Sequence, residues 1–452
     1  MKALGIDIGT TTICGIVIDT VTGETASVRT LPNASVLPGK SFEWLQDPEY
    51  IRTQVQTLYQ ELLVLYPDVC SIGLTGQMHG IVYTDADGRA VSPLYTWQDE
   101  RGNEPEEDGR TYAEHLSDLT GYRMATGYGL TTHYYQMQHG LVPKEAVHFC
   151  TIYDYVGMCL TGRRTPLVSP SSAASHGCFD LKKLQFDTEA IRRAGIDPSF
   201  LPSCGNDCTV IGTTPEGIPV SMGVGDNQAS VIGSVRDSEH SVLINVGTAS
   251  QISAGIGHYV EADGAELRVL AGNSYILVGS GLCGGRAYAA MERFLRSAVI
   301  DMTGEDPGNL YEKMGKVLAR RGTRPGTLQF NTRFCGTREN PEITGGISHL
   351  RLENFTPEEF IYGVLAGVAE ELVTFHAQMR AQGAGAPKYL IGSGNAIRFN
   401  EHFRKIFEEL YGMKMRIPVH REEAAYGAAL YAMTAAGIYP TLEAAQELIT
   451  YV

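Results

Sequence analysis

The chain has 452 residues, 43% hydrophobic and 19% charged, the composition of a globular protein long enough for about three average domains. A net charge of -15 without any Lys/Arg-dense tract argues against nucleic acid and anionic membranes as partners. No stretch approaches the ~20 uninterrupted apolar residues of a membrane span. Asp7 lies where a signal peptide would be apolar, so we expect a cytoplasmic protein, with oligomerisation left open.

Two strands joined by a Gly-Thr turn open the chain, and the same pattern returns in its second half. Residues 4–18 read LGIDIGTTTICGIVI and residues 242–256 read VLINVGTASQISAGI, at a constant offset of 238. Two copies a full domain apart indicate a duplicated unit. The polar stretch GSVRDSEHS at 233–241 directly precedes the second copy. We therefore predict an α/β protein with two domains, residues 1–236 and 237–452.

The two Gly-Thr turns are candidate phosphate sites. Gly9-Thr10-Thr11-Thr12 and Gly247-Thr248-Ala249-Ser250 each combine backbone N–H groups with hydroxyl donors, a pattern that can hold phosphate oxygens. A plain hairpin is the alternative for either turn alone. Because both halves carry such a turn at the equivalent place, we interpret the pair as a clamp for nucleotide phosphates between the domains.

The copies differ at one position, where Asp7 of the first becomes Asn245 of the second. Mg²⁺ that carries a nucleotide phosphate needs a carboxylate, directly or through water. A second carboxylate facing the same phosphates would repel them. We therefore expect Asp7 to be tied to Mg²⁺ and ATP; an acid satisfied by turn amides is the alternative.

Further along, an amphipathic helix and a polar turn are expected. PEYIRTQVQTLYQELLVLYP, at 48–67, places Ile51, Val55, Leu58 and Leu62 on one helical stripe. GLTGQMHGIVY, at 73–83, is an apolar strand that breaks at glycine and then resumes. Its polar centre is either the filling of a tight hairpin or the floor of a pocket for a polar ligand.

SMGVGDNQASVIG, at 221–233, contains the candidate catalytic base. Asp226 follows a Gly-rich turn and precedes small residues suited to close helix packing. It is either the cap of a helix that begins at Asn227, or a carboxylate that accepts the proton of a substrate hydroxyl attacking a γ-phosphate. One residue can do both.

Two glycine turns and a capped helix complete the second half. GSGLCGGRAYAAMERFL, from Gly279, and YLIGSGNAIRFNEHFRKIF, from Tyr389, each run glycines into an amphipathic helix. They either line an adenosine pocket or are tight loops without a ligand; the candidate residues are Gly284, Gly285, Gly392, Gly394 and Asn395. Between them, Thr356-Pro357-Glu358-Glu359 predicts a helix start. That helix is expected to bury Phe360, Val364, Val368, Leu372 and Phe375.

The motifs GIDIGTTT, GLTGQMHG, TWQDERG at 96–102, GVGDNQAS, NVGTASQ and IGSGNAIRFN resemble those of the FGGY carbohydrate kinases, in family order over nearly the whole chain. The resemblance implies two ribonuclease H-like domains of the actin and sugar-kinase superfamily, with sugar and ATP in the cleft between them. It implies that Asp226 is the catalytic base, that Asp7 is tied to Mg-ATP and that the two Gly-Thr turns are phosphate loops. The positions that match sugar-pocket residues are Gln77, Met78, His79, Trp97, Asp99 and Asn227.

The chemistry of these side chains also suits a polyol. Trp97 offers an apolar face to the C–H surface of a sugar, and Asp99, Gln77, His79 and Asn227 supply donors and acceptors for hydroxyl groups. The alternatives are ordinary core packing for Trp97 and a satisfied core imidazole for His79.

Within the family, the Gln-Met-His turn resembles the ketose kinases of the sedoheptulokinase and xylulokinase groups. TWQDERG and TGYRMATGYGLTTHYYQ, at 120–136, resemble the first group more closely, although Gly336-Thr337-Arg338-Glu339-Asn340 departs from its commoner Gly-Glu-Arg with a following proline. The implied reaction converts sedoheptulose to sedoheptulose 7-phosphate, with xylulose or another polyol as the alternative substrate. An actin-like or chaperone-like ATPase is the alternative from a different class of protein.

Overall fold

The computed structural model describes residues 1–262, 264–272, 274–322, 326–337, 340 and 342–452. Two residues of the stretch that departs from the ketose-kinase pattern, Arg338 and Glu339, lie outside the described residues. The chain divides into two compact units. Unit 1 comprises Met1–Arg236, Arg268–Ser274 and His420–Thr450, and unit 2 comprises Asp237–Leu267, Tyr275–Val419 and Tyr451–Val452. The predicted domains, 1–236 and 237–452, stay a prediction; by contacts, the segments 268–274 and 420–450 go with unit 1.

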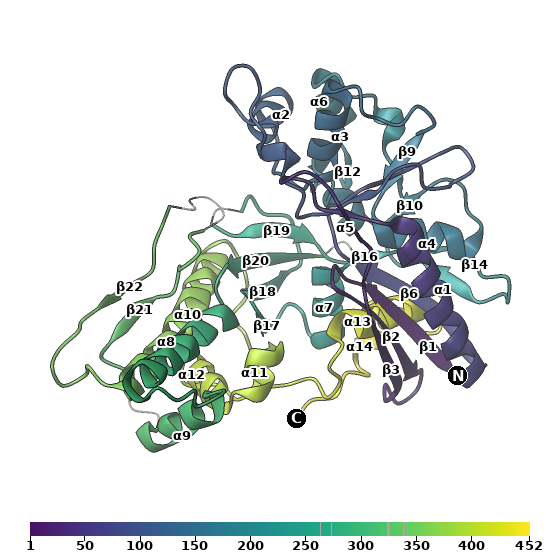
Figure 1. Cartoon of the computed structure of the whole chain (residues 1–452). Helices are drawn as coiled ribbons and strands as arrows, with labels where there is room; N and C mark the ends of the chain where they lie inside the picture. Colours follow the sequence, from purple (N-terminus) through teal and green to yellow (C-terminus); the bar gives the residue numbers. More distant parts are fainter. Residues whose placement is uncertain (263, 273, 323–325, 338–339, 341) are drawn as a thin grey trace. The chain divides into compact units, whose positions relative to one another are not determined.

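In the described part of unit 1, a seven-stranded sheet has the order β14-β15-β6-β1-β2-β3, with β16 also paired to β6 (Figure 1). Its strands are β1 (Lys2–Ile8), β2 (Thr12–Asp19), β3 (Thr25–Pro32), β6 (Val69–Gly76), β14 (Val210–Thr213), β15 (Pro219–Ser221) and β16 (Val224–Gly225). β1 runs antiparallel to β2 and parallel to β6, and β16 is also parallel to β6. Because β1, β6 and β16 are parallel neighbours, their carboxyl ends meet at one edge of the sheet.

Shorter strands and the helices of unit 1 surround this sheet. The shorter strands are β4 (Val36–Leu37), β5 (Leu45–Gln46), β7 (Val82–Thr84), β8 (Leu94–Tyr95), β9 (His148–Cys150), β10 (Leu167–Val168), β11 (Phe179–Asp180), β12 (Gln185–Phe186) and β13 (Ser203–Cys204). The helices are α1 (Pro48–Leu65), α2 (Tyr112–Thr120), α3 (Gly129–Gln138), α4 (Ile152–Thr161), α5 (Pro170–Ala174), α6 (Thr188–Arg193), α7 (Asp226–Ser234), α13 (Glu423–Ala435) and α14 (Leu442–Gln446), with 3-10 turns η1 (Arg101–Asn103) and η2 (Pro198–Phe200).

The predicted helix stripe is confirmed, whereas the hairpin interpretation is wrong. On α1, Ile51, Val55, Leu58 and Leu62 are fully buried in the unit 1 core. β6 and β7, by contrast, do not form a hairpin, because β7 pairs with β9. The residues between them therefore leave the sheet at its edge instead of turning back along it.

Helix α13 packs on the sheet and on α7 through very small residues. A Cβ atom on Gly73 of β6 would lie 1.9 Å from the carbonyl oxygen of Ala428, and one on Gly427 would lie 1.9 Å from that of Ala229. A Cβ atom on Gly233 of α7 would likewise lie 2.0 Å from the carbonyl oxygen of Glu423 on α13. Backbones approach this closely only where side chains are absent. The expected close packing of the helix after Asp226 is thus confirmed.

In the described part of unit 2, a six-stranded sheet has the order β19-β20-β18-β17-β23-β24. The strands of this sheet and of unit 2 are β17 (Ser241–Val246), β18 (Ser250–Ile256), β19 (Glu266–Val269), β20 (Tyr275–Gly281), β21 (Gln329–Asn331), β22 (Gly346–Ser348), β23 (Tyr389–Ser393) and β24 (Met415–Arg416). By contacts, the last two residues of β19, Arg268 and Val269, go with unit 1. Its helices are α8 (Gly285–Thr303), α9 (Tyr311–Arg321), α10 (Pro357–Ala381), α11 (Asn395–Phe399) and α12 (Glu401–Tyr411). β17 is antiparallel to β18 and parallel to β23, which repeats the relation of β1 to β2 and β6.

Helix α10 begins as predicted, at Pro357 with Thr356 as its cap. Val364, Val368 and Leu372 are buried, but Phe360 and Phe375 are only half-buried, so that part of the prediction is wrong. Both rings lie at the margin of the core, where Phe360 packs edge-on against Phe330 and Phe355. The helix is long enough for 3.6-residue periodicity to carry the outer rings away from the buried face.

Candidate functional site

The edge of the unit 1 sheet brings three separate motifs together. In the sheet register, Asp7 of β1 is opposite Thr75 of β6, and Thr75 is opposite Val224 of β16. The first Gly-Thr turn, the Gln-Met-His segment and Asp226 follow directly after these three strand ends. The parallel strands therefore place one candidate from each motif at the same edge.

Asp226 is the first residue of α7, and Gly225 is the cap. The prediction that the helix begins at Asn227 is wrong by one residue. Gly225 lies in an extended conformation against Met78, where a Cβ atom would come 2.5 Å from the sulfur. The backbone N–H of Asn227 donates to Oδ1 of Asp226 at 2.7 Å. A carboxylate in the first turn is also stabilised by the helix dipole.

Burial raises the pKa of Asp226, opposed by the hydrogen bond from Asn227 and the charge of Arg268. Burial, together with the charges of Asp226 and Glu422, raises the pKa of Asp7 to about 7. Oδ1 of Asp7 is buried and has no hydrogen-bond partner among the described residues. The edge is therefore an acidic site that would gain from a cation. Sequence reasoning missed Glu422 and Arg268, because no local pattern marks either and only tertiary packing brings them here.

The first Gly-Thr turn is held by its own backbone and by a neighbouring side chain. The N–H of Gly9 donates to the carbonyl of Thr12 at 2.9 Å. The Nε2 group of Gln46 donates to the carbonyl of Thr10 at 2.8 Å. The side chains of Thr11 and Thr12 are exposed. Hydrogen bonds to its carbonyl groups therefore hold the turn, while the side chains of Thr11 and Thr12 are open to solvent.

Two candidate sugar residues connect to this turn. Nε2 of Gln77, which is buried, donates to Oε1 of Gln46 at 2.8 Å. The indole N–H of Trp97 donates to Oγ1 of Thr10 at 3.0 Å, and the ring is 46% exposed. Trp97 is therefore not ordinary core packing, since nearly half of its surface is open beside the candidate phosphate turn.

His79 is held in a strained conformation. Its φ of 71° lies in the left-handed region, which residues other than glycine seldom adopt. The backbone N–H of His79 donates to Oγ of Ser175 at 3.4 Å, and Nδ1 lies 2.8 Å from the carbonyl oxygen of Ser175. The imidazole stacks on Tyr128 with the ring centres 4.7 Å apart. Tyr128 belongs to the quoted stretch at 120–136 but was not predicted as a site residue. Strain kept by several contacts is a frequent property of binding sites.

Asp99 is fully buried and its carboxylate is occupied by protein groups. Oδ1 accepts from Nε of Arg101 at 2.5 Å, and Oδ2 accepts from Nη2 of Arg101 at 3.0 Å and from the backbone of Trp44 at 3.1 Å. The Arg101 guanidinium also packs over the rings of Tyr95 and Tyr135. In this arrangement Asp99 braces the loop that carries Trp97, and its contact with a sugar stays a prediction.

Met78 and Asn227 complete the predicted sugar set. Met78 is 5% exposed, with its sulfur against Gly225, so it supports the backbone that leads into Asp226. Asn227 is half-buried directly beside Asp226. The structure thus collects the predicted sugar residues in unit 1, some facing outward and others supporting them.

In unit 2, hydrogen bonds join two of the candidate nucleotide turns. The N–H of Gly284 donates to the carbonyl of Thr248 at 3.1 Å, and that of Gly285 to the carbonyl of Gly247 at 2.8 Å. A Cβ atom on Gly284 would come 2.3 Å from the carbonyl oxygen of Ala249. Ser250, at the end of the turn, is buried, while Thr248 and Ala249 are exposed.

In the third glycine turn of unit 2, Gly392 packs into the core, whereas Asn395 is exposed. Gly394 has a φ of 82°, and a Cβ atom there would come 2.7 Å from Oδ1 of Asn245. Asn395 follows as an exposed residue at the start of α11. Gly392 instead faces the core, where a Cβ atom would meet Met415 at 2.4 Å. Close packing therefore accounts for Gly392 without any nucleotide.

Comparison with known families decides the relationship. The model for the N-terminal domain of the FGGY family of carbohydrate kinases matches residues 2–242, more than half of the chain. The chain belongs to the FGGY family of carbohydrate kinases. The actin-like and chaperone-like alternative is accordingly set aside, and the chain is an ATP-dependent carbohydrate kinase.

Individual FGGY relatives are distant. A sedoheptulokinase from Homo sapiens is 24% identical, over 94% of this chain and 96% of the relative. A xylulose kinase from Staphylococcus xylosus is 26% identical, over 54% and 53%. A solved structure of a xylulose kinase from Rhodospirillum rubrum has a TM-score of 0.87 at 20% identity, covering 100% of this chain and 93% of that one. This likeness confirms the predicted α/β fold with two ribonuclease H-like domains.

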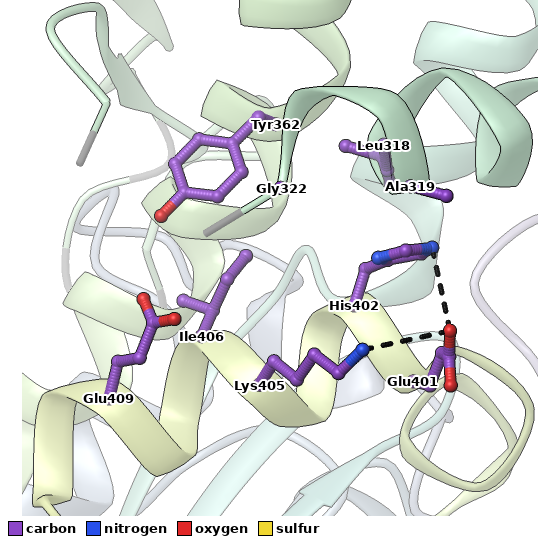
Figure 2. Close-up of a pocket in the computed structure, with 9 residues that line it drawn as sticks. All are labelled: Leu318, Ala319, Gly322, Tyr362, Glu401, His402, Lys405, Ile406 and Glu409. Carbon is purple, nitrogen blue, oxygen red and sulfur yellow. Dashed lines mark ion pairs between the residues drawn. The ribbon is translucent and has the colours of Figure 1, made fainter. Parts of the chain in front are cut away.

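A hollow of about 140 Å³ in unit 2 contains none of the predicted FGGY site residues (Figure 2). It lies among α9, α10 and α12, and one of its walls carries ion pairs of Glu401 with His402 at 3.9 Å and with Lys405 at 3.8 Å. Its lining residues are Leu318, Ala319, Gly322, Tyr362, Glu401, His402, Lys405, Ile406 and Glu409.

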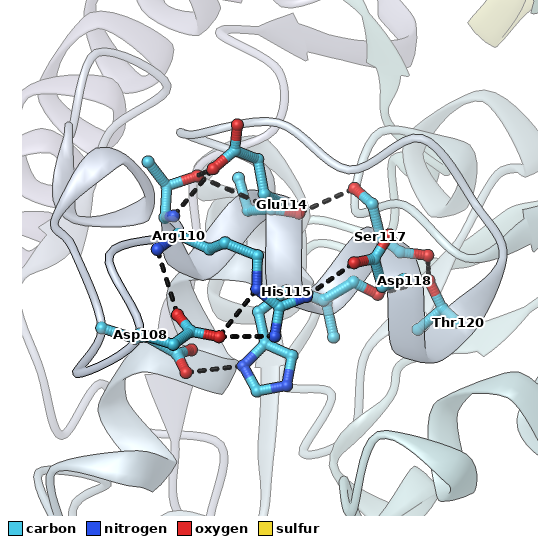
Figure 3. Close-up of polar contacts among 11 residues, drawn as sticks. Asp108, Arg110, Glu114, His115, Ser117, Asp118 and Thr120 are labelled. Carbon is cyan, nitrogen blue, oxygen red and sulfur yellow. Dashed lines mark hydrogen bonds and ion pairs between the residues drawn. The ribbon is translucent and has the colours of Figure 1, made fainter.

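A network of polar contacts on α2 is likewise separate from the predicted site (Figure 3). Arg110 pairs with Asp108 at 2.6 Å and with Asp118 at 2.7 Å, and the side chain of Glu114 closes a capping box at the start of the helix. The Arg110 pairs are exposed, and such pairs contribute about 0–1 kcal/mol each. They connect the loop before α2 to the helix.

Helix α10 is the one helix in the described part of the chain that is long and apolar enough to cross a membrane, and half of its apolar stretch is buried. Core helices share this property. The cytoplasmic location and the absence of membrane and nucleic-acid partners stay predictions.

Proposed function

We propose that the chain transfers the γ-phosphate of Mg-ATP to the terminal primary hydroxyl of a ketose, with sedoheptulose as the preferred substrate and xylulose as the second candidate. The observation that carries the proposal is Asp226 at the start of α7, beside the Gln77–His79 segment at one sheet edge. The likeness to a sedoheptulokinase over almost its full length supports the substrate.

Asp226 is proposed as the general base. A base must be unprotonated yet able to take a proton, and burial raises the pKa of this carboxyl toward the working range. The helix N-terminus and the Asn227 N–H hold its orientation. Asp226 removes the proton from the attacking hydroxyl as the phosphoryl group transfers in line.

Other groups of unit 1 are proposed to bind the sugar. The exposed face of Trp97 covers the C–H surface, and Gln77, His79 and Asn227 hydrogen-bond the hydroxyl groups. Gln77 and His79 are already fixed by Gln46 and Ser175, so they lose little freedom on binding. Unit 2 is proposed to bind ATP through the Gly247–Ser250, Gly284–Gly285 and Gly394–Asn395 turns.

The residues around Asp7 fit a magnesium ion. Oδ1 of Asp7 is a buried oxygen without a hydrogen-bond partner among the described residues, in a field of Asp226 and Glu422 charges. No group of three or more acidic, His or Cys side chains in that part of the chain is arranged to hold a metal by itself. Asp7 would hold the ion together with phosphate oxygens and water. When bound, Mg²⁺ neutralises charge that develops on the phosphates.

A substrate screen tests the proposal. Purified protein is assayed with Mg-ATP and sedoheptulose, xylulose, ribulose, gluconate or glycerol by coupled ADP detection, and product positions are assigned by phosphorus NMR. The expected result is the highest kcat/KM for sedoheptulose with phosphate on the terminal carbon. A higher value for xylulose selects the second candidate, and no rate above ATP alone contradicts sugar phosphorylation.

A further inference from the structure

Two cysteines lie in contact beside the candidate nucleotide turn of unit 2. The Sγ atoms of Cys283 and Cys335 are 3.5 Å apart, although the residues come from different segments of the chain. Both are free thiols, as are the other cysteines. A disulfide requires about 2.05 Å between the sulfurs. The thiols are therefore in contact and need a further approach of more than an ångström to become bonded.

Cys283 is directly attached to the turn that is proposed to bind nucleotide. It precedes Gly284 and Gly285, whose N–H groups donate to the carbonyls of Thr248 and Gly247. The packing leaves no spare room, since even a Cβ atom on Gly284 would overlap the backbone of Ala249. A displacement of Cys283 must therefore be passed on to the Gly247–Ser250 turn.

Cys335 lies in a short turn that is fixed to α10. The N–H of Gly336 donates to the carbonyl of Arg333 at 3.1 Å, which closes the turn around Cys335. Nε of Arg333 donates to Oε1 of Glu371 at 3.1 Å. The other carboxylate oxygen of Glu371 would come 2.9 Å from a Cβ atom on Gly281. Because this contact holds the turn to α10, Cys335 cannot supply the whole approach of the two sulfurs, and part of it must come from movement of Cys283.

The two thiols differ in their access to an oxidant. Cys335 is exposed, whereas Cys283 is 3% exposed. Burial and the contact with Cys335 raise the pKa of Cys283 to about 11, so this sulfur stays protonated and is a slow first nucleophile. An oxidant in solution therefore meets Cys335 first, and Cys283 is the resolving thiol.

We propose that Cys283 and Cys335 are a reversible oxidation site whose disulfide weakens nucleotide binding by unit 2. The Cys335 thiolate attacks a low-molecular-weight disulfide such as glutathione disulfide, forms a mixed disulfide and releases one thiolate. Cys283 then loses its proton to solvent and attacks the Cys335 sulfur, which releases the second thiolate. Two protein thiols are oxidised and one external disulfide is reduced to two thiols. In a reducing compartment such bonds are usually transient and regulatory.

The expected loss of ATP affinity rests on the proposed function of the unit 2 turns. Formation of the Cys283–Cys335 disulfide does not depend on that function. The full-length protein is treated with glutathione disulfide, thiols are counted, and a non-reducing peptide map is searched for the Cys283–Cys335 link. Mg-ATP affinity is measured by calorimetry before oxidation, after oxidation and after dithiothreitol. We expect the link to form and the Kd for Mg-ATP to rise about tenfold, a change of about 1.4 kcal/mol, with recovery on reduction.

Variants separate the disulfide from other oxidation. Cys335→Ser changes an exposed side chain, so it should fold normally and keep its ATP affinity after treatment. Cys70→Ser, in unit 1, is the matched control and should behave like the wild type. Equal loss of affinity in Cys283→Ser would show that modification of Cys335 alone is sufficient, which overturns the proposal. Stable glutathionylation of Cys335 without the link would also overturn it, as would a link that leaves ATP affinity unchanged. Reduced protein that forms the link but never binds Mg-ATP contradicts the proposed function instead.

Discussion

The two Gly-Thr turns begin from one sequence pattern and end in different environments. In the first, residues 9–12 lie between the paired Ile8 and Ile13; in the second, only residues 247–249 lie between Val246 and Ser250. The duplicated sequence therefore folds with a register one residue tighter in unit 2. The charges differ as well, because Asp7 faces other carboxylates whereas Asn245 lies against the glycine turn at Gly394.

This difference supports the proposal that the two units have separate roles. Unit 1 concentrates acidic groups, which suits proton removal and a metal ion. Unit 2 has Asn245 in place of the carboxylate and exposes Thr248 and Ala249 of its turn, which suits an anion. We propose that the repeated strand pair binds different ligands in the two units because the charge at the strand end differs.

The largest expected effect is at Asp226. Asp226→Asn keeps the size of the side chain but removes the base, so kcat should fall about 10²–10⁴-fold. In the wild type, the acidic limb of the kcat profile should lie above the range of an ordinary aspartate, because the pKa of Asp226 is raised. The measurement is a steady-state pH series with sugar binding by calorimetry as the control. A variant that retains the wild-type kcat rules out Asp226 as the base.

The second prediction concerns the acidity of unit 1. Because the pKa of Asp7 is raised from 3.8 to about 7, between these values the folded protein holds a proton that the unfolded chain has released. The free energy of unfolding therefore falls as pH rises through this window. Asp7→Asn removes this contribution and should be more stable than the wild type by a few kcal/mol at pH 8 without Mg²⁺.

Urea unfolding at pH 5 and pH 8 measures this effect. Both tryptophans, Trp44 and Trp97, belong to unit 1, so their fluorescence reports that unit. Asp154, with a pKa also raised to about 7 by burial, remains in both proteins, so the pH slope should shrink without vanishing. Exposed Glu61→Gln is the control, and equal slopes in the wild type and Asp7→Asn would contradict the prediction.

The third prediction concerns a substitution that gives the second Gly-Thr turn the carboxylate found before the first. Asn245→Asp places a carboxylate where ATP phosphates are proposed to bind, and repulsion should raise the KM for ATP about tenfold with little change in the KM for sugar. Raising the salt concentration should narrow the difference. Asn309→Asp adds the same charge at an exposed position of unit 2 and serves as control. An unchanged KM for ATP would place the phosphates elsewhere.

The smallest expected effect is at the link between Trp97 and the first turn. Trp97→Phe keeps an aromatic face but loses the hydrogen bond to Thr10, so the KM for sugar should rise about threefold, as expected from a single hydrogen bond. Thr10→Val removes the acceptor and should give a similar value. In the double variant the effects should not add, since both remove one bond. Additive effects would mean that the two side chains act independently.

Much of the candidate site could be predicted because its residues belong to short sequence motifs. Gly9–Thr12, Gln77–His79 and Asp226 each combine glycine turns with polar residues at strand ends, and parallel strands must bring such ends together. The stripe of α1 was predictable for a similar reason, since burial of one face requires a 3.6-residue period. These features depend on neighbours in sequence.

Only the tertiary structure decided the rest. Sequence marks Asp99 as a polar residue near Trp97, but its pairing with buried Arg101 depends on how the loop folds under Tyr95 and Tyr135. Glu422 reaches Asp7 because α13 returns from the far end of the chain to pack on unit 1. The tighter register of the second turn and the contact between Cys283 and Cys335 are likewise invisible in sequence. The local sequence determines the periodicity of the helices and the residue types in the turns. The pKa shifts and the contacts between distant segments depend on the burial of side chains and on the distances between them, which exist only once the chain has folded.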